Sequence, residues 1–498
     1  MCSFWKSGNN FMKRKVLAPP LSAHKYAAEQ MMLTLFPGQH PEYPETPPQP
    51  GEDSAAFSLE DNAVTARVVW EGREALGRSP FQEPSYRELA GALKLAFYQA
   101  GTALLGRELP WGALTGVRPV KLPTRDLREG FSPKQAQARL QERYHVSPMR
   151  AGMAVDCAQA SRAAELSLAP DQVSVYVGVP FCPTRCAYCS FVSADVGKTL
   201  KLVDPYVELL LEELDAAAAV LRRLGLQVRS FYMGGGTPTV LSAPQLDRVL
   251  SACREKLPLA ACTEYTVEAG RPDTITQEKL KVLKACGVGR ISINPQTLED
   301  QVLEAIGRRH SSQDIIEAFE LARATGFDCI NMDLIAGLPQ DNFYGFYASL
   351  VRVLELEPEN VTIHTLALKK GSRLMEDGSA LPCGEETAAM LDFSIEALHG
   401  NGFRPYYLYR QKYMSGALEN VGWTQPGRES LYNIVMMEEL QSVLSLGAGG
   451  VTKLIRPGGQ EILRLANPKY PQDYLSAREK ILGQKAELSA FFQGQEAL

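Results

Sequence analysis

The sequence predicts an α/β protein whose central part is a partial (β/α)6 barrel. Short apolar segments alternate with amphipathic segments throughout residues 171–370, which is the pattern of a parallel sheet whose strands are joined by helices. Polar residues follow the ends of these apolar segments, and barrels of this type carry their chemistry at those ends. The chain of 498 residues is also too long for one ordinary core, so further domains are expected.

Three domains are predicted. Residues 1–170 form a separate N-terminal α+β domain, because residues 63–70 alternate at the period of a strand and residues 85–105 at the period of a helix. No motif in this domain indicates its role. Residues 171–370 form the barrel, and residues 371–498 break the alternation and predict a mostly helical region that covers the substrate. The aromatic segment PYYLYR in that last region either walls a flat substrate or covers apolar barrel surface.

Six apolar segments within the barrel region predict strands, and five amphipathic segments predict helices. The predicted strands are residues 173–179, 229–233, 264–269, 290–295, 329–335 and 360–366. The predicted helices are residues 204–224, 243–256, 275–286, 313–325 and 342–356. Such an alternation favours a parallel sheet that curves into an incomplete barrel.

The composition favours one class of protein and gives no support for some others. With 45% hydrophobic and 22% charged residues, the chain is expected to be a soluble globular protein. Its net charge of -5 and the absence of long basic runs give no support for a nucleic-acid partner. No apolar run approaches the ~20 residues that cross a bilayer, and no secretion signal is present, so no membrane span and a cytoplasmic location are expected.

Three cysteines, Cys182, Cys186 and Cys189, follow the first predicted barrel strand with the spacing Cys-x3-Cys-x2-Cys. Thiolates at this spacing can hold three irons of a 4Fe-4S cluster and leave the fourth iron without a protein ligand. An open iron can bind the amino and carboxylate groups of S-adenosylmethionine and pass an electron into its sulfonium. A zinc site would need a second ligand pair, which is absent, and a disulfide is disfavoured in a reducing compartment.

Polar residues also follow the next four predicted strands. They are Gly234–Thr237, Glu268, Gln296 and Asp333. The three glycines let the backbone approach a ligand closely and are expected to expose N–H groups to a carboxylate. One carboxylate at a strand end is often only a helix cap, but four polar signals in register with successive strands indicate a ligand site.

Three basic residues near these strand ends have simpler explanations. Arg308 and His310 follow Gln296 in the same loop and helix, where an ordinary basic helix flank is the alternative, and we expect that alternative for His310. His364 lies inside a predicted strand and is interpreted as part of the core or the wall.

Together these motifs resemble the radical S-adenosylmethionine superfamily, and within it the oxygen-independent coproporphyrinogen III oxidase group. The resemblance covers residues 171–455 and rests on PFCPTRCAYCSF, GGGTPT, NMDLIAGLP, HTLALKKGSRL, PYYLYR and LGAGG. It implies a 4Fe-4S cluster and S-adenosylmethionine as cofactors. In the group's reaction an adenosyl radical removes hydrogen from a propionate of coproporphyrinogen III, and loss of carbon dioxide and one electron leaves a vinyl group. Two rounds give protoporphyrinogen IX for haem biosynthesis.

The resemblance also implies roles for individual residues and partners. Cys182, Cys186 and Cys189 would bind the cluster. The S-adenosylmethionine site would comprise Tyr176, Tyr188, Gly235, Gly236, Thr237, Glu268, Gln296, Arg308, Asp333 and Ala367. The implied partners are a porphyrinogen or other tetrapyrrole substrate and a reduced flavodoxin or ferredoxin-type electron donor. No residue is assigned to the catalytic steps on the substrate.

The sequence departs from established catalytic members of the group at two positions. Those members carry His where Gly178 stands and a fourth cysteine where Phe191 stands. A radical enzyme that acts on another tetrapyrrole is therefore one alternative, and a haem chaperone is another. Chaperones of the superfamily bear His-Asn-x-x-Tyr-Trp, whereas Tyr432–Met437 reads YNIVMM here, so we predict the enzyme.

Overall fold

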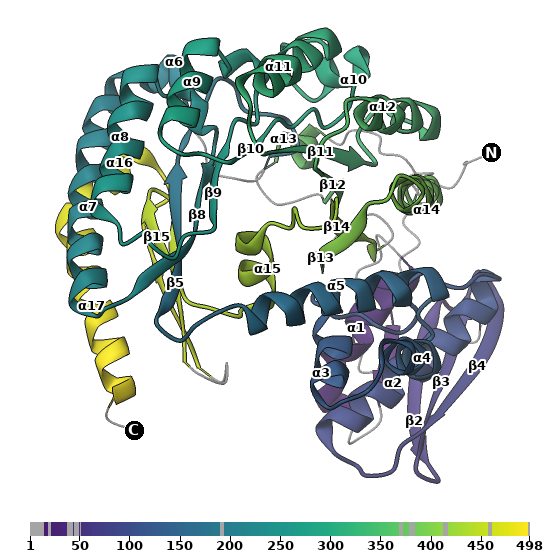
Figure 1. Cartoon of the computed structure of the whole chain (residues 1–498). Coiled ribbons are helices and arrows are strands. Elements are labelled where there is room, and N and C mark those ends of the chain that lie inside the picture. Colours follow the sequence, from purple (N-terminus) through teal and green to yellow (C-terminus); the bar gives the residue numbers. More distant parts are fainter. Residues whose placement is uncertain are drawn as a thin grey trace. The chain divides into compact units, whose positions relative to one another are not determined.

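The computed structural model describes residues 14–17, 21–36, 43, 49, 51–189, 194–367, 372–377, 384–411, 417–456 and 461–496 (Figure 1). Phe191, where the group's fourth cysteine would stand, lies outside these residues. The chain divides into two compact units. One comprises Met1–Val155, Cys383–Glu385 and Tyr409–Glu419, and the other comprises Asp156–Pro382, Glu386–Leu408 and Asn420–Leu498.

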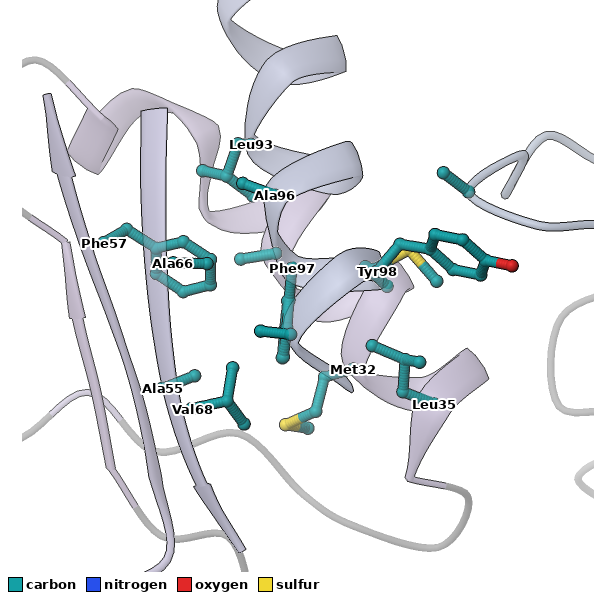
Figure 2. Packing of buried hydrophobic residues seen from close by; sticks show 14 of the residues in the cluster. Met32, Leu35, Ala55, Phe57, Ala66, Val68, Leu93, Ala96, Phe97 and Tyr98 are labelled. Atoms are coloured by element: carbon teal, nitrogen blue, oxygen red, sulfur yellow. The ribbon is translucent and has the colours of Figure 1, made fainter. Parts of the chain in front are cut away.

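The first unit contains a four-stranded sheet with helices packed on it. The strands lie in the order β1 (Arg14–Leu17), β2 (Ser54–Glu60), β3 (Ala63–Trp70) and β4 (Arg73–Pro80). The helices are α1 (Lys25–Leu35), α2 (Tyr86–Leu105), α3 (Lys121–Arg128) and α4 (Pro133–Tyr144), while α5 (Pro148–Leu166) contains the boundary between the units. Helix α2 begins where the Ser85 hydroxyl accepts a hydrogen bond from the Glu88 N–H group, and Phe97 on it meets Phe57 of β2 edge to face (Figure 2).

Six parallel strands form the centre of the second unit. They are β5 (Gln172–Val179), β8 (Gln227–Gly235), β9 (Glu264–Glu268), β10 (Arg290–Ser292), β11 (Cys329–Ala336) and β12 (Asn360–Thr365). They are neighbours in chain order, and every adjacent pair is parallel. The six predicted strands are therefore confirmed, and their carboxyl ends lie on one edge of the sheet.

The helices that follow these strands lie along the outer side of the curved sheet (Figure 1). They are α7 (Val203–Arg223), α8 (Ala243–Lys256), α9 (Gln277–Ala285), α11 (Ser312–Thr325) and α12 (Phe343–Glu355). All five were predicted, and local sequence fixes their ends: Ser242 and Ser311 form capping boxes at α8 and α11. Short elements between them are β6 (Phe181–Cys182), β7 (Ala194–Asp195), α6 (Val196–Thr199) and α10 (Asp300–Ala305).

The C-terminal part of the chain extends the sheet at both edges. Its strands are β13 (Arg404–Arg410), β14 (Glu419–Thr424), β15 (Val443–Gly447), β16 (Val451–Ile455) and β17 (Ile462–Ala466). The order of the whole sheet is β13-β14-β12-β11-β10-β9-β8-β5-β15-β16-β17, so β14 borders β12 and β15 borders β5. The helices are α13 (Arg373–Asp377), α14 (Gly384–Gly400), α15 (Leu431–Glu438), α16 (Pro471–Ser476) and α17 (Arg478–Glu496).

The buried carboxylate of Glu213 connects the C-terminal elements β15, α16 and α17 to helix α7 of the barrel. Glu213 on α7 accepts hydrogen bonds from the Gly447 N–H group and the Tyr474 hydroxyl, both at 2.7 Å, and pairs with the Lys485 ammonium at 2.7 Å. Both partners of this ion pair are buried, so each neutralises a charge that would otherwise lie unpaired in the core. Strand β15 is thus tied to both α7 and α17.

Among the residues that the structure describes, the helices are too short or too polar to span a bilayer.

Candidate functional site

The cysteine loop leaves the carboxyl end of β5 and folds back over the sheet edge. Its short strand β6 pairs in parallel with β7, and the Ala187 N–H group donates to the Ile306 carbonyl at 2.9 Å. The Cys182 sulfur lies 3.5 Å from the Thr237 hydroxyl, which follows the next strand. The loop is therefore held at both ends by the elements that surround it.

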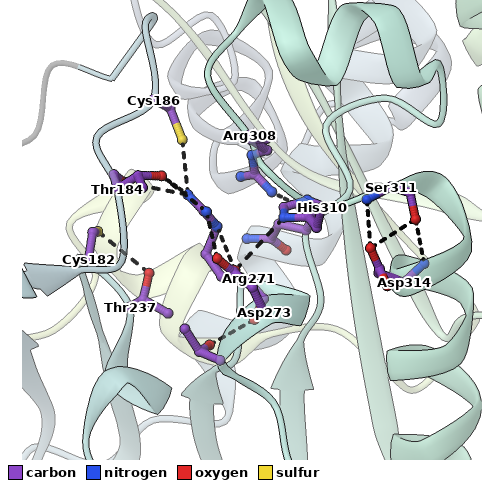
Figure 3. A network of polar contacts seen from close by, with 12 residues as sticks. Cys182, Thr184, Cys186, Thr237, Arg271, Asp273, Arg308, His310, Ser311 and Asp314 are labelled. Atoms are coloured by element: carbon purple, nitrogen blue, oxygen red, sulfur yellow. Dashed lines mark hydrogen bonds and ion pairs between the residues drawn. The ribbon is translucent and has the colours of Figure 1, made fainter. Parts of the chain in front are cut away.

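Two arginines surround the central thiol of the loop (Figure 3). The Arg271 guanidinium donates to the Cys186 sulfur at 3.6 Å and to the Thr184 hydroxyl, and it pairs with Asp273 at 2.9 Å. Burial raises the pKa of Cys186, but the positive charges of Arg308 and Arg271 lower it. Their combined effect exceeds that of burial, so the net pKa is below the ordinary value. A lowered pKa favours the thiolate, which is the metal-binding form.

The cysteine loop carries a donor set that fits an iron–sulfur cluster. Its three thiols are reduced and partly exposed. Among the residues that the structure describes, no three His, Cys, Asp or Glu side chains are grouped to bind one metal ion. A 4Fe-4S cluster needs no such group, because each cysteine binds a different iron, whereas a structural zinc ion needs four close ligands.

The glycine turn after β8 supports the cysteine loop through its backbone. The Gly236 N–H group donates to the Val179 carbonyl at 2.7 Å, and the Thr237 N–H group donates to the Phe181 carbonyl at 2.8 Å. The expectation that this turn exposes its N–H groups is therefore wrong for these two residues. A Cβ atom at Gly236 would lie 2.4 Å from the Phe181 carbonyl oxygen, so the close approach of the loop requires glycine.

Glu268 lies at the end of β9 beside a stack of tyrosines. The Tyr232 hydroxyl donates to the Glu268 carboxylate at 2.7 Å, and the Tyr232 ring stacks on Tyr432 with centroids 4.4 Å apart. Tyr176 stacks on the Tyr232 ring at 6.3 Å. Burial raises the pKa of Glu268 to about 7, and the charge of Asp333 also raises it.

Asp333 lies on β11 and is kept ionised by its neighbours. Its carboxylate accepts a hydrogen bond from the Asn331 amide at 2.7 Å and lies 3.6 Å from the His364 imidazole. Burial raises the pKa of Asp333, but hydrogen bonding and the charge of His364 lower it more, and the net pKa is below the ordinary value. His364, interpreted as core or wall, is half-buried on β12 and forms this pair.

Gln296 lies beside Asp333, and Ala367 follows the end of β12 by two residues. The Gln296 N–H group donates to the Asp333 carbonyl at 2.8 Å, and Gln296 has a φ of 70°, which non-glycine residues rarely adopt. Such a backbone is typical of sites where function imposes strain. Ala367 is half-buried, directly after Leu366, whose N–H group donates to the Ala336 carbonyl.

The predicted residues that follow the strands thus lie at one edge of the sheet. Hydrogen bonds connect neighbouring strands there, for example from Tyr232 to Glu268 and from Gln296 to Asp333. Arg308 links the predicted residue Tyr188 to the segment after β10, since it donates to the Tyr188 hydroxyl at 3.1 Å and to the Asn294 carbonyl at 2.6 Å. Arg271 was missed by sequence reasoning, although it follows the end of β9 by three residues and could have been found by that position.

His310 differs from the expected basic helix flank. Its side chain is 2% exposed, and its Nδ1 atom lies 3.8 Å from the Asp273 carboxylate (Figure 3). Burial lowers the pKa of His310 to about 4, and the charges of Arg308 and Arg271 also lower it, so the ring is neutral at pH 7. Both ring nitrogens lack a hydrogen-bond partner within the described residues.

Gly178 lies where the backbone of the LGAGG turn crosses β5. The Tyr206 hydroxyl donates to the Gly178 carbonyl, and a Cβ atom at Gly178 would lie 2.8 Å from the Ala448 carbonyl oxygen. A side chain at this position therefore requires the turn to move. The histidine that established members carry here has no room in this chain.

This crowding leads to a stability prediction. We expect Gly178→Ala to lower the free energy of unfolding by about 1 to 3 kcal/mol, because the new methyl group overpacks the backbone of the turn. Urea titration of the variant and the wild type measures the loss. Gly483→Ala is the matched control, because nothing lies within 4 Å of a Cβ atom at that exposed helical glycine. Equal stability of Gly178→Ala and the wild type would contradict the packing described.

Comparisons with known proteins agree with this arrangement. The model of the radical SAM superfamily matches residues 176–349. The chain is 37% identical over 398 residues to the oxygen-independent coproporphyrinogen-III oxidase-like protein HemZ of Bacillus subtilis, covering 79% of each chain. It is 33% identical over 280 residues to the heme chaperone HemW of Lactococcus lactis, covering 55% of this chain and 68% of that one.

Among solved structures, the coproporphyrinogen III oxidase HemN of Escherichia coli, described as a radical SAM enzyme, superposes with a TM-score of 0.51. The likeness covers 65% of this chain and 72% of that chain at 23% sequence identity. At this identity the likeness concerns the fold alone. It confirms the predicted fold class.

Proposed function

The chain belongs to the radical SAM superfamily, in the family of oxygen-independent coproporphyrinogen-III oxidase-like proteins, and on that premise we propose that it converts propionates of coproporphyrinogen III to vinyl groups. Membership of the superfamily implies a 4Fe-4S cluster and S-adenosylmethionine. When bound, these cofactors supply the adenosyl radical that removes a hydrogen atom from the substrate. Each round would also release carbon dioxide and pass one electron to an external one-electron acceptor, and two rounds would give protoporphyrinogen IX.

In this proposal Cys182, Cys186 and Cys189 hold the cluster. The position of the three cysteines in one loop after β5, the contact of Arg271 with the Cys186 sulfur and the lowered pKa of Cys186 support this assignment. Arg271 acts as a positioning residue, because it joins Cys186 to Thr184 within the loop and is itself fixed by Asp273. The backbone bonds from Gly236 and Thr237 keep the loop against the sheet edge.

The half-buried carboxylates Glu268 and Asp333 are proposed to bind the polar groups of S-adenosylmethionine. Asp333 is held ionised by His364 and can accept hydrogen bonds from hydroxyl or amino groups. Glu268 is oriented by the Tyr232 hydroxyl and can accept from the amino group in its ionised form. Tyr176, Tyr188, Gln296, Arg308 and Ala367 complete the proposed site together with the glycine turn.

One observation supports the proposal: the three-thiol loop and the two half-buried carboxylates, Glu268 and Asp333, follow or lie at the carboxyl ends of strands on the same edge of the sheet. The direct test is anaerobic incubation of the reconstituted protein with coproporphyrinogen III, S-adenosylmethionine and a reductant, followed by mass spectrometry of the porphyrin. We expect the masses of the singly and doubly decarboxylated products. Formation of 5'-deoxyadenosine without decarboxylation would contradict coproporphyrinogen III as the substrate and favour another tetrapyrrole.

A haem chaperone is the second candidate, because HemW is among the relatives. Tyr432 stands where the chaperone motif has its histidine, and it is 5% exposed and stacked on Tyr232. Its helix α15 is fastened at the start, where the Ser430 hydroxyl donates to the buried Glu264 carboxylate at 2.9 Å. This side chain therefore faces the barrel interior and cannot reach a haem iron outside it.

We accordingly expect no stable stoichiometric binding of haem. Titration of the full chain with haemin, followed by gel filtration and absorbance at the Soret band, measures it. A complex that survives gel filtration, combined with no turnover of coproporphyrinogen III under reducing conditions, would favour the carrier and defeat the proposed oxidase.

A further inference from the structure

Helix α15 lies inside the curve of the barrel sheet, and its start is held by one buried carboxylate (Figure 1). The Glu264 carboxylate accepts a hydrogen bond from the Ser430 hydroxyl at 2.9 Å. It also accepts from the Leu431 and Tyr432 N–H groups, the first residues of the helix. Glu264 begins β9, so a charge on the sheet itself caps the helix. The first turn of α15, which contains Tyr432, is therefore fixed against the strands.

Tyr432 packs from this position on two tyrosines of the barrel strands. Its ring stacks on Tyr232 of β8, with the centroids 4.4 Å apart and the ring planes 19° apart. It also stacks on Tyr176 of β5, with the centroids 6.1 Å apart. Tyr432 is buried, and Val435 of the same helix belongs to the same apolar cluster. The three rings therefore limit one another's rotation, because close packing leaves little space for a ring to turn.

The same Tyr232 side chain orients a carboxylate of the proposed site. Its hydroxyl donates to the half-buried Glu268 carboxylate at 2.7 Å. Burial raises the pKa of Glu268, whereas hydrogen bonds from the Tyr232 hydroxyl and the Gly235 backbone lower it. Loss of the Tyr232 hydrogen bond would thus favour the protonated carboxyl group. Within the described residues, the titratable groups that face Glu268 are Tyr232 of β8, Asp333 of β11, Tyr176 of β5 and Tyr432 of α15.

We propose that Tyr432 is a positioning residue for Glu268, because its ring fixes the orientation from which the Tyr232 hydroxyl donates to that carboxylate. A tyrosine without a stacking partner can adopt further rotamers, and its hydroxyl then spends less time on one acceptor. The effect on cofactor binding rests on the proposed function, in which the ionised Glu268 accepts from the amino group of S-adenosylmethionine. Tyr432 acts on that binding through Tyr232.

The first test titrates Glu268 in the full chain without cluster or S-adenosylmethionine. Infrared difference spectra follow its carboxyl band, which is assigned by its absence in Glu268→Gln. We expect Tyr232→Phe to raise the midpoint by about one pH unit, because the lost hydrogen bond stabilised the charged form. Tyr432→Leu should raise it by at least half as much, whereas Tyr432→Phe keeps the ring and should titrate as the wild type. Tyr232→Phe combined with Tyr432→Leu should give no further rise, since no hydroxyl is left to misplace.

Tyr265→Leu is the matched control. Tyr265 precedes Glu268 by three residues on β9, so its side chain lies on the opposite face of the strand, where it stacks on Phe231 with the centroids 4.2 Å apart. Its loss should lower stability but leave the midpoint of Glu268 unchanged. If Tyr432→Leu does not fold, Tyr432→Met decides, because methionine fills the space with a flexible chain. A midpoint equal to that of the wild type, or an equal rise in Tyr265→Leu, would overturn the positioning role.

A second readout separates this inference from the proposed function. Anaerobic titrations of the reconstituted proteins give the dissociation constant for S-adenosylmethionine at several pH values. The constant of Tyr432→Leu divided by that of the wild type should be about three to ten below both midpoints and one above them, because the titration of S-adenosylmethionine itself cancels in the ratio. A ratio of one at every pH, together with a raised midpoint of Glu268, would support the positioning role and defeat the proposed contact of Glu268 with the cofactor. An unchanged midpoint would overturn the positioning role whatever the affinity.

Discussion

Cys186→Ala should abolish the iron–sulfur cluster while leaving the barrel folded. The proposed site has only three thiolates, and the central one has the lowered pKa and the contact with Arg271. Losing one of three ligands opens a second iron to solvent, and we expect iron content to fall from about four per chain to near zero. Iron analysis and visible absorbance after anaerobic reconstitution measure the loss, and no 5'-deoxyadenosine should form.

Cys262→Ala is the matched control for this experiment. Cys262 is also partly exposed in the barrel unit, but its sulfur donates to the Glu264 carbonyl at 3.2 Å, and burial raises its pKa to about 11. This thiol stays protonated at neutral pH and should not bind iron. Far-ultraviolet circular dichroism should be unchanged in both variants. A full cluster in Cys186→Ala would show that another residue is a ligand.

Asp333→Asn should weaken S-adenosylmethionine binding by roughly ten- to a hundredfold, since a hydrogen bond to a charged acceptor contributes about 1.5 to 3 kcal/mol. The near-isosteric amide keeps the acceptor for Asn331 but loses the charge that pairs with His364. That pair is partly exposed, so its loss should lower the unfolding free energy by about 1 kcal/mol or less. Anaerobic titration of the reconstituted variant with S-adenosylmethionine measures the affinity.

The control for this second variant is Asp341→Asn. Asp341 also lies in the barrel unit, where it is buried, and its carboxylate accepts from the Asn342 N–H group at 2.9 Å at the start of α12. It directly precedes Asn342, the residue that caps α12, so its place beside a helix start resembles the structural role that the sequence alone would assign to Asp333. We expect its affinity for S-adenosylmethionine to match the wild type. An unchanged affinity in Asp333→Asn, together with lower stability, would give Asp333 a purely structural role.

The barrel could be predicted from sequence because its signals are local. Each strand is a short apolar run, each helix has a polar face, and serines such as Ser242 and Ser311 mark the helix starts. The strands β13 to β17 were not predicted individually, because their identity depends on pairing with distant segments. Val443–Gly447, for instance, becomes a strand by lying along β5.

The sequence predicts which strand ends carry the site residues, but it does not predict the hydrogen-bond partners of those residues. Strand order brings Glu268 and Asp333 to one edge, and counting strands was sufficient to find them. The engagement of the Gly236 N–H group by Val179 could not be read from sequence, because it depends on how the cysteine loop folds back. The burial of His310 likewise could not be read from sequence, because its partner Asp273 lies in a different loop.

The pairing of β15 with β5 sets an order of events during synthesis. Val175 and Tyr176 lie opposite Leu444 and Ser445, so the strand that leads into the cysteine loop lacks its neighbour until nearly the whole chain has left the ribosome. The Lys485 ammonium, which neutralises Glu213, emerges later still. Such long-range pairing is slow and exposes strand edges in the meantime. We therefore expect metal loading to follow completion of the chain, and nascent chains stalled before residue 443 to remain without iron and susceptible to proteolysis.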